Sequence, residues 1–362
     1  MIRSLGAWLR WLAGHALRGR GAHLVFAIGV ILVLLAFRDS NYFHADNLRV
    51  VLLNSSSVAI ASVGMAYLMI AGGIDLSIGS IFVAAGFAAG DLSIHTSPVI
   101  AVLGGLALAG ALGLINGLLV WRIRVSPIIV TLGTLTLIGG VVTVISKGAG
   151  VYGFPGGFLS IGQSSPLGVP TEIWIMGALA IVAAVILSTT TIGAHIYALG
   201  GNREASELAG VRVRRLTLGL FVFAGLAAGL AGIITTARFG VADISFGVDF
   251  NLNVITATIL GGVAFSGGEG TVGGVILAVI FLNVVSSGLI ASGVNPYYSD
   301  VITGAALVVS VGLEQLTHER NDRIRREIAL AEMMAASGGD EVDPPPRKSP
   351  RSFAALSPWR DR

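Results

Sequence analysis

The chain has 362 residues and a formal net charge of +3 at pH 7, with 54% hydrophobic and only 12% charged residues. Its mean hydropathy is +0.83, which excludes an ordinary soluble domain, where about 25% of residues are charged. Because the chain contains no cysteine, disulfides, thiol catalysis and cysteine-ligated metal sites are excluded as well. The composition indicates a protein that is mostly embedded in a membrane.

Residues 1–21 are expected to form a cytoplasmic segment that lies at the membrane surface. Trp8, Leu9, Trp11 and Leu12 occur among arginines here, as in amphipathic interfacial segments. The apolar run that follows ends without the small-residue cleavage pattern of a signal peptide. We therefore expect the first crossing to be retained.

Residues 22–317 are expected to form an all-α, polytopic transmembrane domain. A helix of about 20 apolar residues crosses a hydrocarbon core of about 30 Å. Ten segments reach or approach that length, and they lie at residues 22–37, 50–71, 77–90, 98–121, 127–146, 173–191, 216–237, 252–266, 272–292 and 297–316. The third and eighth are short. Short or glycine-interrupted segments point to a transport path, although misplaced segment ends would give the same pattern.

Glycine, with 50 residues, interrupts these segments. Pairs at four-residue spacing, such as Gly86 and Gly90, allow close helix packing. Two clusters, GGIDLSIGS at residues 72–80 and GGVAFSGGEGTVGG at residues 261–274, are too rich in glycine for a uniform helix. Inside a membrane, broken backbone needs protein or a water-filled cavity to satisfy its polar groups. The glycines expected to break helices are Gly72, Gly73, Gly261, Gly262, Gly267 and Gly268.

A carboxylate lies within each glycine cluster, Asp75 in the first and Glu269 in the second. A carboxylate at membrane depth is costly unless it is hydrogen-bonded or reaches water. Asp75 followed by Ser77 also resembles the N-cap region of the third crossing. A structural role therefore competes with a transport role at both carboxylates.

The polar insert at Ala194–Arg215 separates two apolar stretches near the middle of the chain. Asn202 is a good N-cap, Glu204 places a negative charge in the first turn, and Gly210 is a natural C′ stop, which together frame a helix of about two turns. On helical spacing its apolar residues oppose its charged ones. The apolar residues are Ala205, Leu208 and Ala209, and the charged ones are Arg203 and Glu207. The insert is either a contact site for a partner or an ordinary interfacial loop.

The chain after residue 317 is expected to leave the membrane. Residues 318–337 carry pairs of opposite charge at i,i+4 spacing, such as Glu319 with Arg323, which predicts a charged cytoplasmic helix. Residues 338–362 are polar and rich in proline, which predicts a disordered tail.

A few polar residues inside the apolar segments offer amide or hydroxyl groups suited to an uncharged polyol. Hydrogen bonding between helices is the alternative for each of them. No ladder of charged residues runs through the segments, which disfavours a proton-coupled pump. The candidate translocation path comprises Asn54, Asp75, Ser77, Asn116, Asn253, Thr256 and Asn283.

Basic residues predict the orientation, because cytoplasmic segments carry an excess of lysine and arginine. With the N-terminus inside, the cytoplasmic side holds Arg3, Arg10, Arg18, Arg20, Arg122, Arg124, Arg203, Arg212, Arg214, Arg215 and the basic residues after Arg320. The other side holds only Arg38, Arg49, Lys147 and Arg238. Both termini and the polar insert are therefore expected in the cytoplasm.

Motifs of common enzymes are missing from the sequence. It contains no G-x-x-x-x-G-K-[ST] phosphate loop, no H-E-x-x-H and no G-x-S-x-G, and its six histidines show no ligand spacing. We therefore expect no catalytic residue, no metal site and no ability to hydrolyse ATP.

Three motifs, GGIDLSIGS at 72–80, GGNREASELAGV at 200–211 and GGVAFSGGEGTVGG at 261–274, resemble those of the membrane permease subunits of bacterial ATP-binding-cassette importers for ribose, xylose, arabinose and galactose. The similarity spans about residues 20–320, and the long tail departs from the family. The resemblance implies a multi-pass subunit of the bacterial inner membrane. It also implies a coupling helix that contacts an ATPase and comprises Asn202, Arg203, Glu204, Ala205, Glu207, Leu208 and Gly210.

The resemblance further implies partners: a second permease subunit, identical or not, a cytoplasmic ATP-binding subunit and an extracytoplasmic sugar-binding protein. ATP would be used by a partner, so no cofactor is expected in this chain. Permeases for branched-chain amino acids, nucleosides or signalling furanosyl compounds remain alternatives, as do a self-contained secondary transporter and a membrane scaffold without transport.

Overall fold

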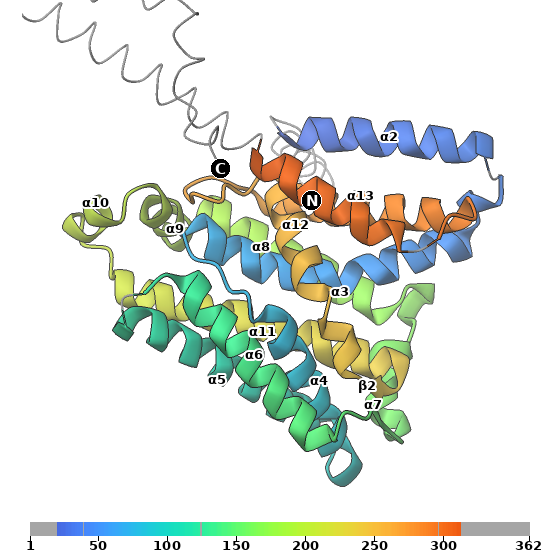
Figure 1. Ribbon diagram of the computed structural model, residues 1–362, viewed down its shortest axis with the longest axis horizontal. Coiled ribbons are helices and arrows are strands. Elements are labelled where there is room, and N and C mark those ends of the chain that lie inside the picture. Colours follow the sequence, from blue (N-terminus) through green and yellow to red (C-terminus); the bar gives the residue numbers. More distant parts are fainter. Residues whose placement is uncertain (1–19, 39, 124, 296, 313–362) are drawn as a thin grey trace, which may run out of the picture. The chain divides into compact units, whose positions relative to one another are not determined.

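The computed structural model describes residues 20–38, 40–123, 125–295 and 297–312 (Figure 1). The expected charged helix at 318–337 and the tail at 338–362 lie outside the described residues, as does the expected interfacial segment except for residues 20 and 21.

Helices dominate the described chain, and a single short antiparallel pair joins its two strands. Val151 pairs with Ala242 in that pair, and Tyr152 pairs with Val241. In chain order the elements are α2 (Arg20–Arg38), η1 (Ser40–Phe43), α3 (Ala45–Ile70), α4 (Ile78–His95), α5 (Pro98–Ile123), α6 (Pro127–Ser146), β1 (Val151–Tyr152), α7 (Gly156–Gln163), η2 (Pro166–Gly168), α8 (Thr171–Thr189), α9 (Thr191–Gly201), α10 (Arg203–Leu208), α11 (Val213–Phe239), β2 (Val241–Ala242), η3 (Ile244–Gly247), α12 (Phe250–Leu260), α13 (Val272–Ala291) and a last helix at Tyr298–Gly312.

Within the described ranges, seven helices are long and apolar enough to cross a membrane: α3, α4, α5, α6, α8, α11 and α13. Shorter apolar helices lie at Leu24–Phe37, Ile244–Leu260 and Tyr298–Gly312. Each of the ten predicted segments thus coincides with an apolar helix, and the predicted all-α polytopic fold is confirmed.

Two predicted segment ends are wrong. The third segment was expected to stop at residue 90, but α4 continues to His95, because Asp91 lies on its exposed side and the helix stops only before Pro98. The eighth was expected to reach residue 266, but α12 ends at Leu260. Gly262 has a φ of +88°, a conformation that no helix interior accepts, so the chain turns away there.

Glycines let α11 pack closely on its neighbours α4 and α5. A Cβ on Gly86 of α4 would lie 2.8 Å from the carbonyl oxygen of Gly232 in α11, and one on Gly225 of α11 would lie 2.6 Å from that of Ala109 in α5. Such distances leave no room for a side chain, so the backbones themselves are in contact. The close packing predicted from the glycine pairs is therefore confirmed for Gly86, and the same packing occurs at Gly225.

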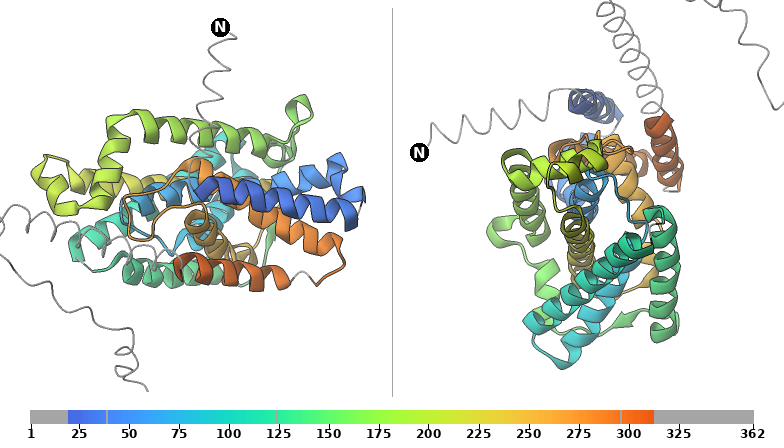
Figure 2. Two further views of the ribbon diagram at one scale, coloured as in Figure 1. Left: turned by 90° about the horizontal axis from the view of Figure 1, so that it is seen from above. Right: turned by 90° about the vertical axis from the view of Figure 1, so that its left-hand side faces the viewer.

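The periphery is built by the first and last helices. Helix α2 lies along α13, and Leu35, Tyr42, Val51 and Val284 form a small separate core there (Figures 1 and 2). The last helix, at the red end of the colour bar, lies at the edge of the bundle in Figure 2. Helices α9 and α10 lie at one end of the bundle, the α10 end, and β2 and α7 lie at the opposite end (Figure 1).

Candidate functional site

Helix α10 is a short helix with defined caps at both ends. The Asn202 side-chain oxygen accepts a hydrogen bond of 2.9 Å from the Ala205 N–H. At the other end Gly210 has a φ of +85°, and its N–H donates to the Glu207 carbonyl while the Val211 N–H donates to that of Ser206, both at 3.0 Å. This is the Schellman arrangement that glycine favours at C′. Both predicted caps are present.

The first part of the polar insert is helical as well, which the sequence had not indicated. Residues 194–201 belong to α9, whose N-cap Thr190 accepts a hydrogen bond from the Gly193 N–H. The insert is therefore a pair of short helices joined at Asn202. The expectation of a single helix within a loop is corrected, because a threonine cap upstream starts an earlier helix.

Almost the whole surface of α10 is exposed. Ser206 is its only buried residue, and Leu208 keeps 91% of its surface exposed. An apolar side chain in this position can bury its surface in a partner, as the anchor residues of interfaces do. The Arg203 guanidinium lies 5.5 Å from the centre of the Trp121 ring and pairs with the Glu207 carboxylate at 3.7 Å.

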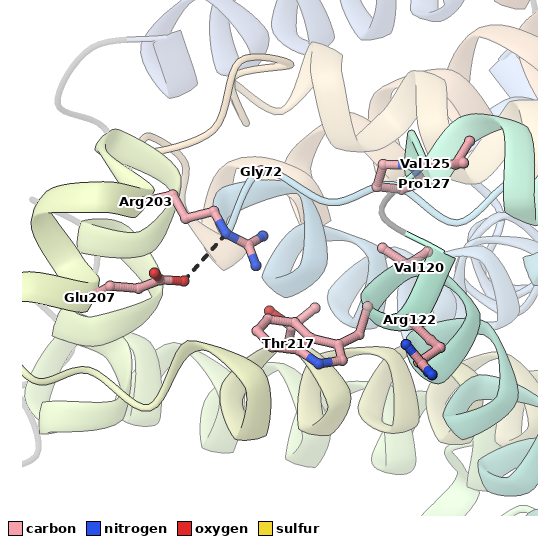
Figure 3. A pocket seen from close by; sticks show the side chains of 9 residues that line it. Gly72, Val120, Arg122, Val125, Pro127, Arg203, Glu207 and Thr217 are labelled. Carbon is pink, nitrogen blue, oxygen red and sulfur yellow. Dashed lines mark ion pairs between the residues drawn. The ribbon is translucent and has the colours of Figure 1, made fainter.

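A hollow of about 630 Å³ separates α10 from the end of α5 and the start of α11 (Figure 3). Arg203 and Glu207 reach toward it from α10, and Thr217 lies on its α11 side. Its lining consists of Gly72, Val120, Trp121, Arg122, Val125, Pro127, Arg203, Glu207 and Thr217. The hollow thus lies between the exposed helix and the glycine break after α3.

Three segments meet at a set of glycines that we call the glycine junction, namely Gly72, Gly200, Gly267 and Gly268. A Cβ on Gly200 would overlap the Ile70 carbonyl oxygen and lie 2.5 Å from the Gly268 nitrogen. The Gly268 N–H donates to that same carbonyl at 2.8 Å. Helix α9 is therefore in direct backbone contact with the end of α3 and with the loop between α12 and α13.

Asp75, Ser77 and Asn116 form one buried polar cluster. The Asp75 carboxylate accepts hydrogen bonds from the Ser77 N–H at 2.8 Å, the Ser77 hydroxyl at 2.6 Å and the Asn116 side-chain amide at 3.1 Å. All three residues have no exposed surface. The Asn116 Oδ1 has no partner among the described residues. The cluster ties the extended segment after α3 to α5. Glu269, in the other glycine cluster, is exposed.

Two other members of the predicted path, Asn253 and Asn283, line a polar cavity of about 160 Å³. The cavity lies between α3, α12, α13 and the last helix, and its remaining lining residues are Val58, Val279, Leu282, Ser286, Ser299, Asp300 and Thr303. Ser286, Ser299, Asp300 and Thr303 were not predicted. Helical spacing is the sequence signal that could have found them, because residues three or four apart lie on the same face of a helix. Ser286 follows Asn283 by three residues, and Thr303 follows Ser299 by four and Asp300 by three.

Asn54 and Thr256 lie apart from these two sets. The Asn54 side-chain oxygen accepts a hydrogen bond of 3.4 Å from Arg238, whose guanidinium also pairs with the buried Glu172 carboxylate at 3.3 Å. Thr256 is fully buried, and its hydroxyl has no partner in the described part of the chain. The seven predicted residues are therefore distributed over four places in the structure, and their role in a translocation path stays a prediction.

Comparisons with known proteins identify relatives over most of the chain. Residues 47–311 match the family model described as branched-chain amino acid transport system / permease component. The chain is 35% identical to the ribose import permease protein of Escherichia coli K12 over 294 residues, which are 79% of this chain and 91% of that protein.

The names of other relatives mention different sugars. The chain is 32% identical to the L-arabinose ABC transporter permease protein of Azospirillum brasilense, covering 83% of this chain and 88% of that protein. It is also 32% identical to the galactose/methyl galactoside import permease protein of Escherichia coli K12, covering 80% and 93%. No solved structure matches the chain.

Proposed function

The chain belongs to the branched-chain amino acid transport system / permease component family, and on that premise we propose that it is the membrane-spanning permease subunit of an ATP-binding-cassette importer for a monosaccharide. The observation that carries this proposal is the similarity to sugar import permeases over about nine tenths of their length. Ribose, arabinose and galactose appear in the names of these relatives, which supports a small neutral sugar as the solute.

In this proposal the energy comes from a partner. The sequence has no phosphate loop, so a separate cytoplasmic ATP-binding subunit hydrolyses ATP and this chain carries no cofactor. An extracytoplasmic sugar-binding protein delivers the solute, and a second permease subunit completes the path. Both termini and α10 face the cytoplasm of a bacterial cell, in line with the distribution of arginines.

Helix α10 is the proposed coupling helix, which contacts the ATP-binding subunit. The residues assigned to this contact are Asn202, Arg203, Glu204, Ala205, Glu207, Leu208 and Gly210. Leu208 supports the assignment, because its side chain has no cover within the described chain and would bury its apolar surface in a partner. The caps support it too, since they keep so short a helix formed without a core beneath it.

The glycine junction supplies the route by which a push on α10 reaches the membrane interior. Helix α9 continues directly into α10 through Asn202, and its Gly200 touches the end of α3. Because these backbones are in contact without side chains between them, a shift of α9 displaces both glycine-broken segments together. ATP binding would thereby switch the subunit between inward-facing and outward-facing states.

Transport in a reconstituted system tests the proposal. We expect vesicles containing this chain, its ATP-binding subunit and its binding protein to accumulate at least one of the three labelled sugars ribose, arabinose and galactose when ATP is present. Uptake at the same rate without the ATP-binding subunit would indicate a self-contained transporter. Accumulation of leucine but of none of the sugars would assign the chain to an amino-acid importer.

A further inference from the structure

We propose that the cavity between α3, α12, α13 and the last helix is a water-accessible binding site for a neutral polyol, and that Asp300 excludes anionic solutes from it. The inference rests on the proposed function, because it assumes that a solute passes through this chain. It goes further by naming where the solute binds and which charge it can have.

One side of the cavity carries polar groups that can take the place of water around the hydroxyl groups of a solute. Asn253 and Asn283 contribute side-chain amides, of which that of Asn283 also donates to the Val279 carbonyl, and the hydroxyls of Ser286 and Ser299 share a hydrogen bond of 2.9 Å between α13 and the last helix. Amides and hydroxyls both donate and accept hydrogen bonds, as sugar hydroxyls do. A volume of about 160 Å³ equals roughly five waters at about 30 Å³ each, which is the scale of a small solute.

The other side of the cavity is apolar. Val58 of α3 and Val279 and Leu282 of α13 line it, opposite the last helix. An apolar surface facing a few placed polar groups is typical of sites for small molecules. A sugar ring has the matching character, with C–H groups on its faces and hydroxyls around its edge.

Among the described residues that line the cavity, Asp300 is the only ionisable one. It lies in the first turn of the last helix, where a carboxylate also favours the helix dipole. An interaction with the helix dipole would not require Asp300 to lie at a cavity. Asp300 nevertheless lines the cavity and is exposed. A carboxylate is too costly to face hydrocarbon, so this side of the last helix faces water.

No cation lines the cavity to balance Asp300. Arg238 approaches from α11, but its guanidinium pairs with Glu172 and reaches Asn54, one helical turn before Val58 on α3. A carboxylate can accept hydrogen bonds from two neighbouring hydroxyls of a sugar, whereas it repels a sugar acid, a sugar phosphate or the carboxylate of an amino acid. The residues that line the cavity therefore favour neutral polyols over amino acids, although amino acids are named in the description of the family.

The absence of cysteine from the chain makes the test direct. Asn283→Cys and Ser286→Cys are made separately and assembled in vesicles with the ATP-binding subunit and the sugar-binding protein. Each is then treated with small cationic and anionic methanethiosulfonates, with and without ATP. The matched control is Thr136→Cys, which is exposed at the middle of the apolar helix α6. It should remain unmodified, because water-soluble reagents do not reach hydrocarbon.

With each rate divided by the rate of the same reagent with a free thiol in solution, we expect the cationic reagent to modify both cavity positions about tenfold faster than the anionic one, because the Asp300 carboxylate attracts a cation and repels an anion. Adding Asp300→Asn should bring the two rates close to equality, and saturating ribose should slow modification. Failure of both reagents at both positions, with and without ATP, would show a dry cavity and overturn the proposal. So would a charge preference that Asp300→Asn leaves unchanged.

ATP-driven sugar uptake is measured with the same vesicles, which separates the two proposals. Normal uptake together with unreactive cavity positions contradicts only the subsite. Loss of ATP-dependence contradicts the proposed function.

Discussion

At the scale of single residues, Gly200 and Gly201 are neighbours in one helix with opposite surroundings. A Cβ on Gly200 would overlap the Ile70 carbonyl oxygen, whereas a Cβ on Gly201 would meet nothing within 4 Å. Neither residue has a positive φ, so both positions accept the backbone conformation of alanine. Only the space around Cβ distinguishes them.

We therefore expect Gly200→Ala to lower the free energy of unfolding by about 1–3 kcal/mol, as overpacking does, and to slow ATP-dependent uptake. Gly201→Ala should be neutral or stabilise α9 by up to about 1 kcal/mol, because alanine is the better helix former. Thermal unfolding in detergent and uptake in vesicles measure the two effects. Equal behaviour of the two variants would contradict the close contact at the glycine junction.

The residue scale also shows what local sequence can and cannot reveal. Asn202 and Gly210 were readable as caps because a cap depends on bonds within a few residues of itself. Asp75 was ambiguous between a cap and a path residue, and its two roles could be weighed only once Asn116, 41 residues away, was found beside it. Asp300 was overlooked because its neighbours in the cavity come from α3, α12 and α13.

At the scale of elements, α10 combines a stable form with an uncovered surface. Leu208 is 91% exposed, so replacing it should leave the fold of the isolated chain unchanged. In the assembled importer we expect Leu208→Asp to weaken retention of the ATP-binding subunit by about tenfold or more, as loss of a buried apolar anchor does. Co-purification at increasing dilution measures this retention.

Leu167 provides the matched control for that prediction. It is 92% exposed, and it lies in η2 before the start of α8, whereas α9 follows the end of α8. Its φ of +57° is compatible with aspartate, which tolerates this region better than most residues. Leu167→Asp should leave retention of the ATP-binding subunit unchanged. A similar loss in both variants would point to a general effect of the added charge.

Element boundaries followed from the sequence where a local signal ends the helix. The glycines after Ile70 and Leu260 stop α3 and α12, and Pro98 starts α5. Helix α4 ran past its expected end because a single charged residue, Asp91, can face outward without ending a helix. The sequence does not predict helix α9, because its apolar and polar residues are mixed over only about three turns.

At the scale of the whole molecule, charge separates the two ends of the bundle. Arg122 and Arg203 line the hollow at the α10 end, while Arg238 is paired with Glu172 on α8 and Arg49 donates to Ser165 just before α8 begins. The excess of arginine at the α10 end continues through Arg212, Arg214 and Arg215. Such an excess predicts that the α10 end is cytoplasmic.

Cysteine labelling measures this orientation. A membrane-impermeant maleimide added to intact spheroplasts should modify Leu167→Cys and leave Ala209→Cys unmodified, and inside-out vesicles should show the reverse. Both positions are exposed in the structure, so in cells that produce this chain without its partner subunits access depends on the side of the membrane alone. The opposite pattern would invert the orientation and remove α10 from the reach of a cytoplasmic ATPase.

By itself the sequence determined the ten apolar segments, the two glycine breaks and the caps of α10. Each of these depends on hydropathy or on hydrogen bonds between residues that are close in the chain, so a short stretch of sequence is enough to predict it. Only the tertiary structure decided that Gly72, Gly200 and Gly267 touch, and that Asn253, Asn283 and Asp300 line one cavity. Those contacts arise when helices pack against one another, and packing joins residues whose separation along the chain carries no periodic signal.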